Sequence, residues 1–352
     1  MTASEAAPRE IRFEFTGKAR EYFGIWIVNV LLTVVTLGIY SAWAKVRRKR
    51  YFYGHTQFAG SSFKYLADPV AILKGWLLAV AVFAVYSASI HFYPRSAPVF
   101  MIAFLIVLPW LIVRSLSFNA HNSAFRNIRF HFERNYREAI KVFIGLSLLI
   151  PLTLGFIFPY AAYRQKKFII DNSSYGGGRF DLQVSPKKFY IAYLKALGLL
   201  ILCIAVVVGI SVATTAIYGK PTGGQEEMKQ QAQMIGLIVA AAIMSLYLLV
   251  FLYLNTIVTN LVWSHTVINA NRFHSSLRFR RLLWLYFSGV VAVVLSLGLL
   301  APWARIRLAR YRFANLRMFV HGDLDSFIAK AQAAVGAGGE EVGEFLGVDI
   351  GL

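Results

Sequence analysis

The sequence has a single cysteine, Cys203, in 352 residues. One cysteine cannot form a disulfide within the chain, and it makes a cysteine-based metal site implausible. Charged residues are also scarce, at 15% of the chain against 57% hydrophobic residues. Soluble domains typically contain about 25% charged residues. This composition indicates a membrane protein and argues against a soluble enzyme or binding domain.

Acidic residues are the rarer charge, with 17 Asp and Glu against 37 Lys and Arg and a net charge of +20. No acid lies deep in an apolar run, which disfavours proton-coupled transport because that process usually uses an intramembrane carboxylate. The basic residues lie directly beside the apolar runs, as the positive-inside rule and contact with anionic headgroups require. We therefore expect membrane lipids, chiefly anionic ones, as partners, and no nucleic acid.

Catalytic motifs are missing from the sequence as well. Its seven histidines are scattered, and neither a nucleophile elbow nor a P-loop is present. The sequence thus predicts no catalytic residue, no metal, no cofactor and no enzymatic activity. The first 21 residues contain no apolar h-region, so we expect the first apolar run, rather than a cleaved signal peptide, to direct insertion.

The chain contains seven long apolar runs. The length of each run approaches or exceeds the roughly 17–25 residues that cross a bilayer as a helix. Their solid apolar character also excludes an outer-membrane barrel, whose strands alternate between apolar and polar residues. The seven runs cover residues 22–44, 69–90, 97–113, 139–160, 189–218, 234–258 and 282–303.

An internal repeat organises these runs. Three segments align without a gap on the glycine of a Thr/Ser-Leu-Gly motif, at Gly38, Gly155 and Gly298. Other recurring positions are Arg12-Phe13, Arg129-Phe130 and Arg272-Phe273; Arg20, Arg137 and Arg280; and Ala44, Ala161 and Ala304. Each unit begins with a short alternating stretch, typical of a strand, followed by an apolar run and a basic segment. A Gly-rich aromatic stretch, typical of a β-hairpin, comes next, at residues 51–65 and 168–184.

The repeat predicts an all-α polytopic membrane protein with re-entrant or interrupted helices and small cytoplasmic β-elements. The expected divisions are an N-terminal tail (1–11), two units of three apolar runs (12–128 and 129–271), a truncated third unit with one run (272–322), and an acidic tail (323–352).

Several of these motifs resemble those of the YjgN family of bacterial inner-membrane proteins. The matching segments are Phe13-Glu14-Phe15-Thr16-Gly17, Thr36-Leu37-Gly38-Ile39-Tyr40, Trp43-Ala44-Lys45-Val46-Arg47 and Val348-Asp349-Ile350-Gly351-Leu352. The resemblance covers essentially the whole chain and implies a bacterial inner membrane. It implies no activity and no functional residues, because that family is a domain of unknown function.

The distribution of the basic residues along the chain indicates which apolar runs cross the membrane. If all seven runs span, the basic residues divide almost evenly between the two sides. If the first run of each unit re-enters at its glycine, only Arg95, Lys220 and Lys229 of the 37 basic residues lie outside. The positive-inside rule therefore favours re-entry, with both termini cytoplasmic. Simple spanning by an apolar run of this length remains the alternative.

A recurring aromatic–cation stripe is the candidate binding site. Helical spacing puts its three members on one face in each unit, where three stripes can attract an anion or a lipid headgroup. The alternative is an interfacial belt of aromatic residues and anchoring cations. Arg48 and Lys49, on other faces, are interpreted as generic anchors. The stripes are Trp43, Arg47 and Arg50; Tyr160, Arg164 and Lys167; and Trp303, Arg307 and Arg310.

Two functions of different classes remain open. One is a channel or transporter for an anionic or amphiphilic solute, since re-entrant backbone is tolerated where protein or a water-filled cavity surrounds it. The other is a membrane scaffold that organises lipids without transport. The acidic tail docks on the protein's own basic cytoplasmic face, recruits a basic protein partner, or is simply solvated. Self-association into a homo-oligomer is also left open.

Overall fold

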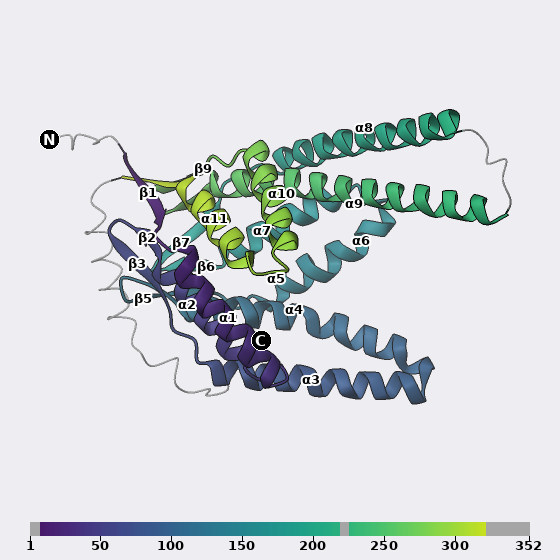
Figure 1. The fold of residues 1–352 in the computed structure, drawn as a ribbon. Coiled ribbons are helices and arrows are strands. Elements are labelled where there is room, and N and C mark those ends of the chain that lie inside the picture. The colour runs from purple at the N-terminus through teal and green to yellow at the C-terminus, as the bar shows by residue number, and fades with distance from the viewer. Residues whose placement is uncertain (1–7, 219–224, 322–352) are drawn as a thin grey trace.

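Ten short strands gather at one end of the molecule, and the helices project from that end (Figure 1). The computed structural model describes residues 8–218 and 225–321. The acidic tail lies outside these residues. The strands are β1 (Arg9–Phe15), β2 (Thr56–Phe58), β3 (Ser61–Tyr65), β4 (Ser123–Phe125), β5 (Ile128–Phe132), β6 (Ser173–Tyr175), β7 (Gly178–Leu182), β8 (Thr266–Ile268), β9 (Asn271–Ser275) and β10 (Leu316–Val320).

These strands form one closed antiparallel barrel, in which β1 pairs with β2 on one side and with β10 on the other. The prediction of an all-α protein is therefore wrong. The expected small β-elements exist, but they join into a single barrel. Most of them are only three or five residues long, and several pair with strands more than 40 residues away in sequence. Local periodicity carries no information about such distant pairing.

Alternation within each strand separates the two faces of the barrel. In β9, Asn271, Phe273 and Ser275 are buried, whereas Arg272 and His274 are exposed. This period of two places charged side chains on the outside and apolar ones inside, where the largest apolar cluster lies. A transmembrane barrel has the opposite pattern, so this barrel faces water.

Three helical hairpins are short and share a break at the repeated motif. They comprise α1 (Ala19–Val35) and α2 (Ser41–Gly54); α5 (Tyr136–Ile140), the π-helix η2 (Lys141–Gly145), α6 (Leu146–Leu152) and α7 (Phe158–Asp171); and α10 (Phe279–Leu295) and α11 (Ala301–Ala314). In the first, Leu37 has φ +50° and Gly38 has φ +92°, and the other two breaks repeat these values closely.

The Thr/Ser-Leu-Gly motif explains this break residue by residue. The N–H of Gly38 donates to the carbonyl of Thr33 at 2.8 Å, which closes the end of α1 as a left-handed cap. The hydroxyl of Thr36 accepts a bond from the N–H of Tyr40 at 2.9 Å and so helps to start the next helix. Thr153 and Ser296 accept the corresponding bonds in the other hairpins.

Two helical hairpins are long and splay away from the barrel (Figure 1). One comprises α3 (Pro69–Phe92), the 3₁₀ turn η1 (Pro94–Ser96) and α4 (Ala97–His121), and the other α8 (Pro186–Tyr218) and α9 (Gln225–Trp263). Within the described residues, four segments are long and apolar enough to cross a membrane, and they belong to these hairpins. The other three apolar runs form the interrupted short hairpins.

Closure of the barrel can be tested with a disulfide. Glu10 of β1 lies opposite Phe319 of β10, and antiparallel partners have Cα separations that suit a disulfide. We expect Glu10→Cys with Phe319→Cys, in a Cys203→Ala background, to form an intramolecular disulfide under mild oxidation, detected in linked peptides by tandem mass spectrometry. Glu10→Cys with His131→Cys on β5 is the control and should stay reduced. Equal yields from the two pairs would contradict a closed barrel.

A candidate anion-binding pocket

The first cations of the three predicted stripes each bind within their own helical hairpin. Arg47 donates to the hydroxyl of Tyr40 at 3.0 Å and reaches Oδ1 of Asn29 at 3.5 Å. Arg164 forms an ion pair with Glu138 at 3.1 Å. Arg307 donates to Ser288 at 2.7 Å, with its guanidinium 5.1 Å from the ring centre of Trp303. These contacts hold the two helices of each hairpin together.

The second cations connect the hairpins to the barrel. Arg50 donates to the carbonyl of Ala67 at 3.2 Å, Lys167 to that of Leu182 at 3.3 Å, and Arg310 to that of Gly17 at 3.0 Å. Each carbonyl lies at or just after the end of a strand. The remaining aromatic members, Trp43 and Tyr160, pack against the apolar clusters beside the barrel. Binding of an anion or a headgroup by the stripes stays a prediction.

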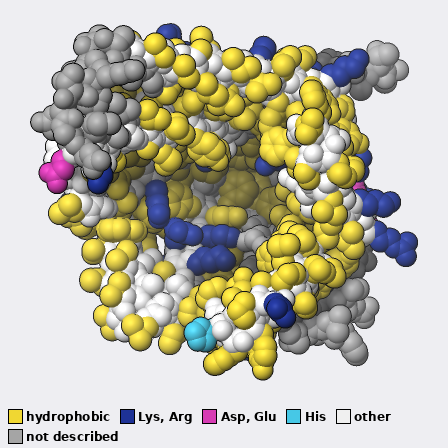
Figure 2. All heavy atoms as spheres, turned by 90° about the vertical axis from the view of Figure 1, so that its right-hand side faces the viewer, with side chains coloured by type: hydrophobic (Ala, Val, Ile, Leu, Met, Phe, Trp, Pro, Cys, Tyr) yellow, Lys and Arg dark blue, Asp and Glu magenta, His cyan; other side chains and the backbone are white. Residues whose placement is uncertain are grey.

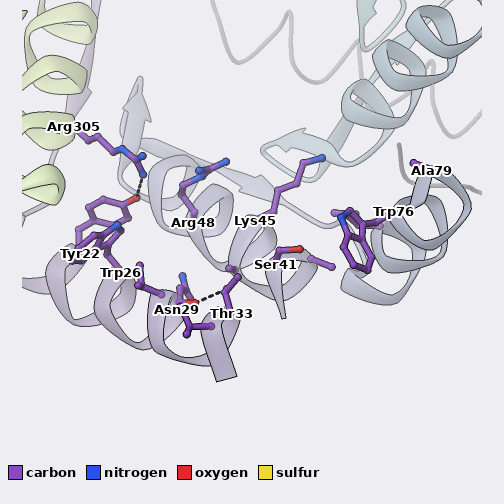
Figure 3. Close-up of a pocket in the computed structure, with 15 residues that line it drawn as sticks. Tyr22, Trp26, Asn29, Thr33, Ser41, Lys45, Arg48, Trp76, Ala79 and Arg305 are labelled. Carbon is purple, nitrogen blue, oxygen red and sulfur yellow. Dashed lines mark hydrogen bonds between the residues drawn. The ribbon is translucent and has the colours of Figure 1, made fainter. Parts of the chain in front are cut away.

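A cavity of about 630 Å³ lies between α1, α2, α3 and one residue of α11. We call it the basic pocket, and its defining residues are the cations Lys45, Arg48 and Arg305 with Trp26, Trp76 and Asn29. Figure 3 shows Lys45 and Arg48 extending from α2, Arg305 reaching in from α11, and Trp76 on α3 at the far side.

The charge of the basic pocket is of one sign, since no Asp or Glu of the described residues lines it. Arg305 donates to the hydroxyl of Tyr22 at 3.4 Å. Within residues 8–218 and 225–321, the side chains of Lys45 and Arg48 take part in none of the hydrogen bonds or ion pairs that the structure contains. Three cations facing one cavity repel each other, so an anion there would be stabilised by all three.

The pKa of Lys49 depends on its burial and on two of the same cations. It lies half-buried on α2, against the ring of Tyr65 at 4.6 Å and the side-chain oxygen of Asn119. Burial, and then the charges of Lys45 and Arg48, lower the pKa of Lys49 to about 8. Burial is the larger cause of this lowered pKa, and the repulsion from Lys45 and Arg48 adds to it.

The helical end of the molecule is hollowed and mostly apolar. Figure 2 looks onto the helical end of the molecule, where hydrophobic side chains surround a hollow with Lys and Arg side chains at its bottom. Val30, Val34 and Ala79 add apolar surface to the lining of the pocket itself. A charged base beneath an apolar wall suits a ligand with an anionic end and an apolar body.

Arg305 reaches the pocket only because the barrel closes. β10 follows α11, and its pairing with β1 brings α11 beside α1. The ring of Phe313 stacks on that of Phe15 at 5.9 Å, and the bond from Arg310 to Gly17 fixes the same contact. The pocket therefore combines residues that are more than 250 positions apart in sequence.

Sequence reasoning missed this pocket. It interpreted Arg48 as a generic anchor and singled out neither Lys45 nor Arg305. One signal was present, because Lys45 and Arg305 follow Gly38 and Gly298 at the same distance, where the second unit has Ala162. The described part of the chain contains no cluster of three His, Cys, Asp or Glu side chains arranged to hold a metal ion.

Comparison with known proteins identifies relatives over nearly the whole chain. The inner membrane protein YjgN of Salmonella typhimurium (strain LT2) is 28% identical over 363 aligned residues, covering 89% of each chain. Its namesake in Escherichia coli O157:H7 is 30% identical over 150 residues, which is 42% of this chain and 37% of that protein. No solved structure matches. Residues 10–345 match the family described as "Bacterial protein of unknown function (DUF898)", which confirms the resemblance: the chain belongs to this family.

Proposed function

We propose that the protein is a multi-pass inner-membrane protein that admits an anionic or amphiphilic solute to the basic pocket, as part of a transport pathway. One observation carries the proposal: three cations from two hairpins that are far apart in sequence face a single cavity, and no acid in the part of the chain that the structure describes lines it. Structural anchoring does not need this arrangement, because anchoring cations usually extend to separate headgroups at the membrane surface. The named relatives, which are inner membrane proteins, support the location.

The strand pairing supports re-entry of the three short hairpins. β1 pairs with β2, β5 with β6, and β9 with β10, so each short hairpin starts and ends at the same rim of the barrel. At about 1.5 Å per residue, the 17 residues of α1 extend about 26 Å and the 14 of α2 about 21 Å, against a hydrocarbon core of about 30 Å. A water-facing barrel in the cytoplasm would leave the tips of these hairpins inside the bilayer.

A scaffold without transport is the second candidate, and the hairpin tips favour it. Leu37, Leu154 and Leu297 are 90%, 89% and 94% exposed at the three breaks. Such exposed leucines suit hydrocarbon rather than water, so the tips can act as a wedge in the cytoplasmic leaflet. The scaffold accounts for the tips but gives no role to the unneutralised cations of the pocket, and we therefore favour the pathway.

Re-entry predicts a specific labelling pattern. In a Cys203→Ala background, Lys18→Cys and His55→Cys flank the first short hairpin, and both should be shielded from an impermeant thiol reagent added outside the cells. Arg95→Cys, at the turn between α3 and α4, should react and serves as the positive control. Labelling of only one of positions 18 and 55 would indicate that the first run spans the membrane.

Occupation of the basic pocket should raise the pKa of Lys49. Burial and then the repulsion from Lys45 and Arg48 lower this pKa to about 8, and an anion beside the two cations offsets the part that is due to repulsion. The measurement is an NMR titration of dimethylated lysines, with the Lys49 signal assigned through Lys49→Arg. We expect dodecyl phosphate, in a neutral detergent, to move the midpoint upward.

The control for this titration is Lys45→Gln with Arg48→Gln. Removing the two charges should raise the pKa of Lys49 without any ligand and abolish the response to dodecyl phosphate. An unchanged midpoint in the unmodified pocket, at saturating dodecyl phosphate, would contradict the proposed function.

A further inference from the structure

The interior of the barrel is filled by two sets of five side chains. Phe13, Phe63, Phe130, Phe180 and Phe273 come from β1, β3, β5, β7 and β9, which are alternate strands of the barrel. Each lies opposite an inward residue of a neighbouring strand, in the pairs Phe13–Phe58, Phe63–Phe125, Phe130–Tyr175, Phe180–Ile268 and Phe273–Met318. All ten residues belong to the same apolar cluster or pack against it.

The phenylalanines of the odd strands form most of a ring. Ring centres are 6.4 Å apart for Phe13 and Phe63, 6.5 Å for Phe63 and Phe130, and 6.4 Å for Phe13 and Phe273. Phe180 lies 6.3 Å from Phe273. These are the separations of aromatic rings in contact. The barrel is therefore a packed core rather than a pore, and a charged solute would lose its hydration on entering it.

A sealed barrel leaves the bilayer side as the route into the basic pocket. Val34, which lines the pocket near the tip of α1, is 68% exposed, so the lining continues onto apolar surface that the proposed re-entry would place in hydrocarbon. The cavity volume of about 630 Å³ accommodates a headgroup and the adjoining part of a ligand, while the rest extends along the helices. A wholly polar anion would have to cross this apolar surface unaided.

We infer that the ligand of the basic pocket is an anionic membrane phospholipid, which enters sideways from the cytoplasmic leaflet with its phosphate on Lys45, Arg48 and Arg305 and its acyl chains against Trp26 and Trp76. This inference rests on the proposed function and names its substrate class. Phosphate accepts several charge-assisted hydrogen bonds at once, which offsets the repulsion among the three cations. The sealed barrel then keeps the headgroup from leaving along the axis into water.

Native mass spectrometry of the full chain, released from nanodiscs, tests this lipid assignment. The nanodiscs contain equal amounts of phosphatidylglycerol and phosphatidylcholine. We expect the protein to retain phosphatidylglycerol in preference to phosphatidylcholine, and the Lys45→Gln/Arg48→Gln variant to lose at least about tenfold of that preference, equivalent to about 1.4 kcal/mol. Lys64→Gln/Arg129→Gln, on the exposed outside of the barrel, removes the same charge and should leave the preference unchanged.

A competition arm distinguishes the lipid from a free phosphate. Glycerophosphoglycerol, which is phosphatidylglycerol without its acyl chains, carries the same phosphodiester headgroup, and we expect it not to displace the retained phosphatidylglycerol at millimolar concentration. Displacement by it, or equal loss of preference in the two double variants, would overturn the lipid assignment. If dodecyl phosphate raises the pKa of Lys49 but no phospholipid is retained, the proposed function survives and the lipid assignment alone is wrong.

Discussion

The pairing of β1 with β10 is the contact on which the rest of the molecule depends. It joins the two ends of the described chain and converts ten short strands into a closed barrel. Every helical hairpin then starts and ends on that one ring of strands. This pairing holds α11 beside α1, and that position of α11 brings Arg305 into the basic pocket.

The three short hairpins share one frame but differ in how their charges are satisfied. In the second, Arg164 is neutralised by Glu138, and Lys167 lies 2.8 Å from Asp171. Where the first and third hairpins meet, Lys45, Arg48 and Arg305 face a cavity that no acid within residues 8–218 and 225–321 lines. The helix break is the same in all three hairpins because it depends only on the Thr/Ser-Leu-Gly residues themselves, through the positive φ of the leucine and glycine and the bond to the hydroxyl. The residues around the break can therefore differ. Uncompensated charge is thus a property of one interface, and not of the recurring unit.

Local chemistry accounts for what the sequence could predict. A leucine and a glycine with positive φ after a hydroxyl residue end one helix and start the next, and this signal lies within a few residues. Apolar runs are equally local, and four of them correspond to helices long enough to span. Such features need no knowledge of the remainder of the chain.

Distant pairing accounts for what the sequence could not predict. A three-residue strand such as β4 has too few residues to reveal its distant partner β3, although a two-residue turn joins it to its other neighbour, β5. The basic pocket could not be predicted for the same reason, because Tyr22 and Arg305 are 283 positions apart in sequence and come together only in the fold. The contact of Phe13 with Phe273, with ring centres 6.4 Å apart, likewise joins distant strands and forms only when the barrel closes. Hence the helices could be predicted individually, whereas the site formed between them could not.

An electron cryo-microscopy map of the protein in nanodiscs that contain phosphatidylglycerol would show whether barrel closure builds a lipid pocket above a sealed barrel. We expect headgroup density in contact with Lys45, Arg48 and Arg305, acyl-chain density along Trp26 and Trp76, and a continuous β1–β10 pair around packed phenylalanine side chains. A water-filled channel through the barrel, or α11 separated from α1 with no lipid between the hairpins, would contradict it.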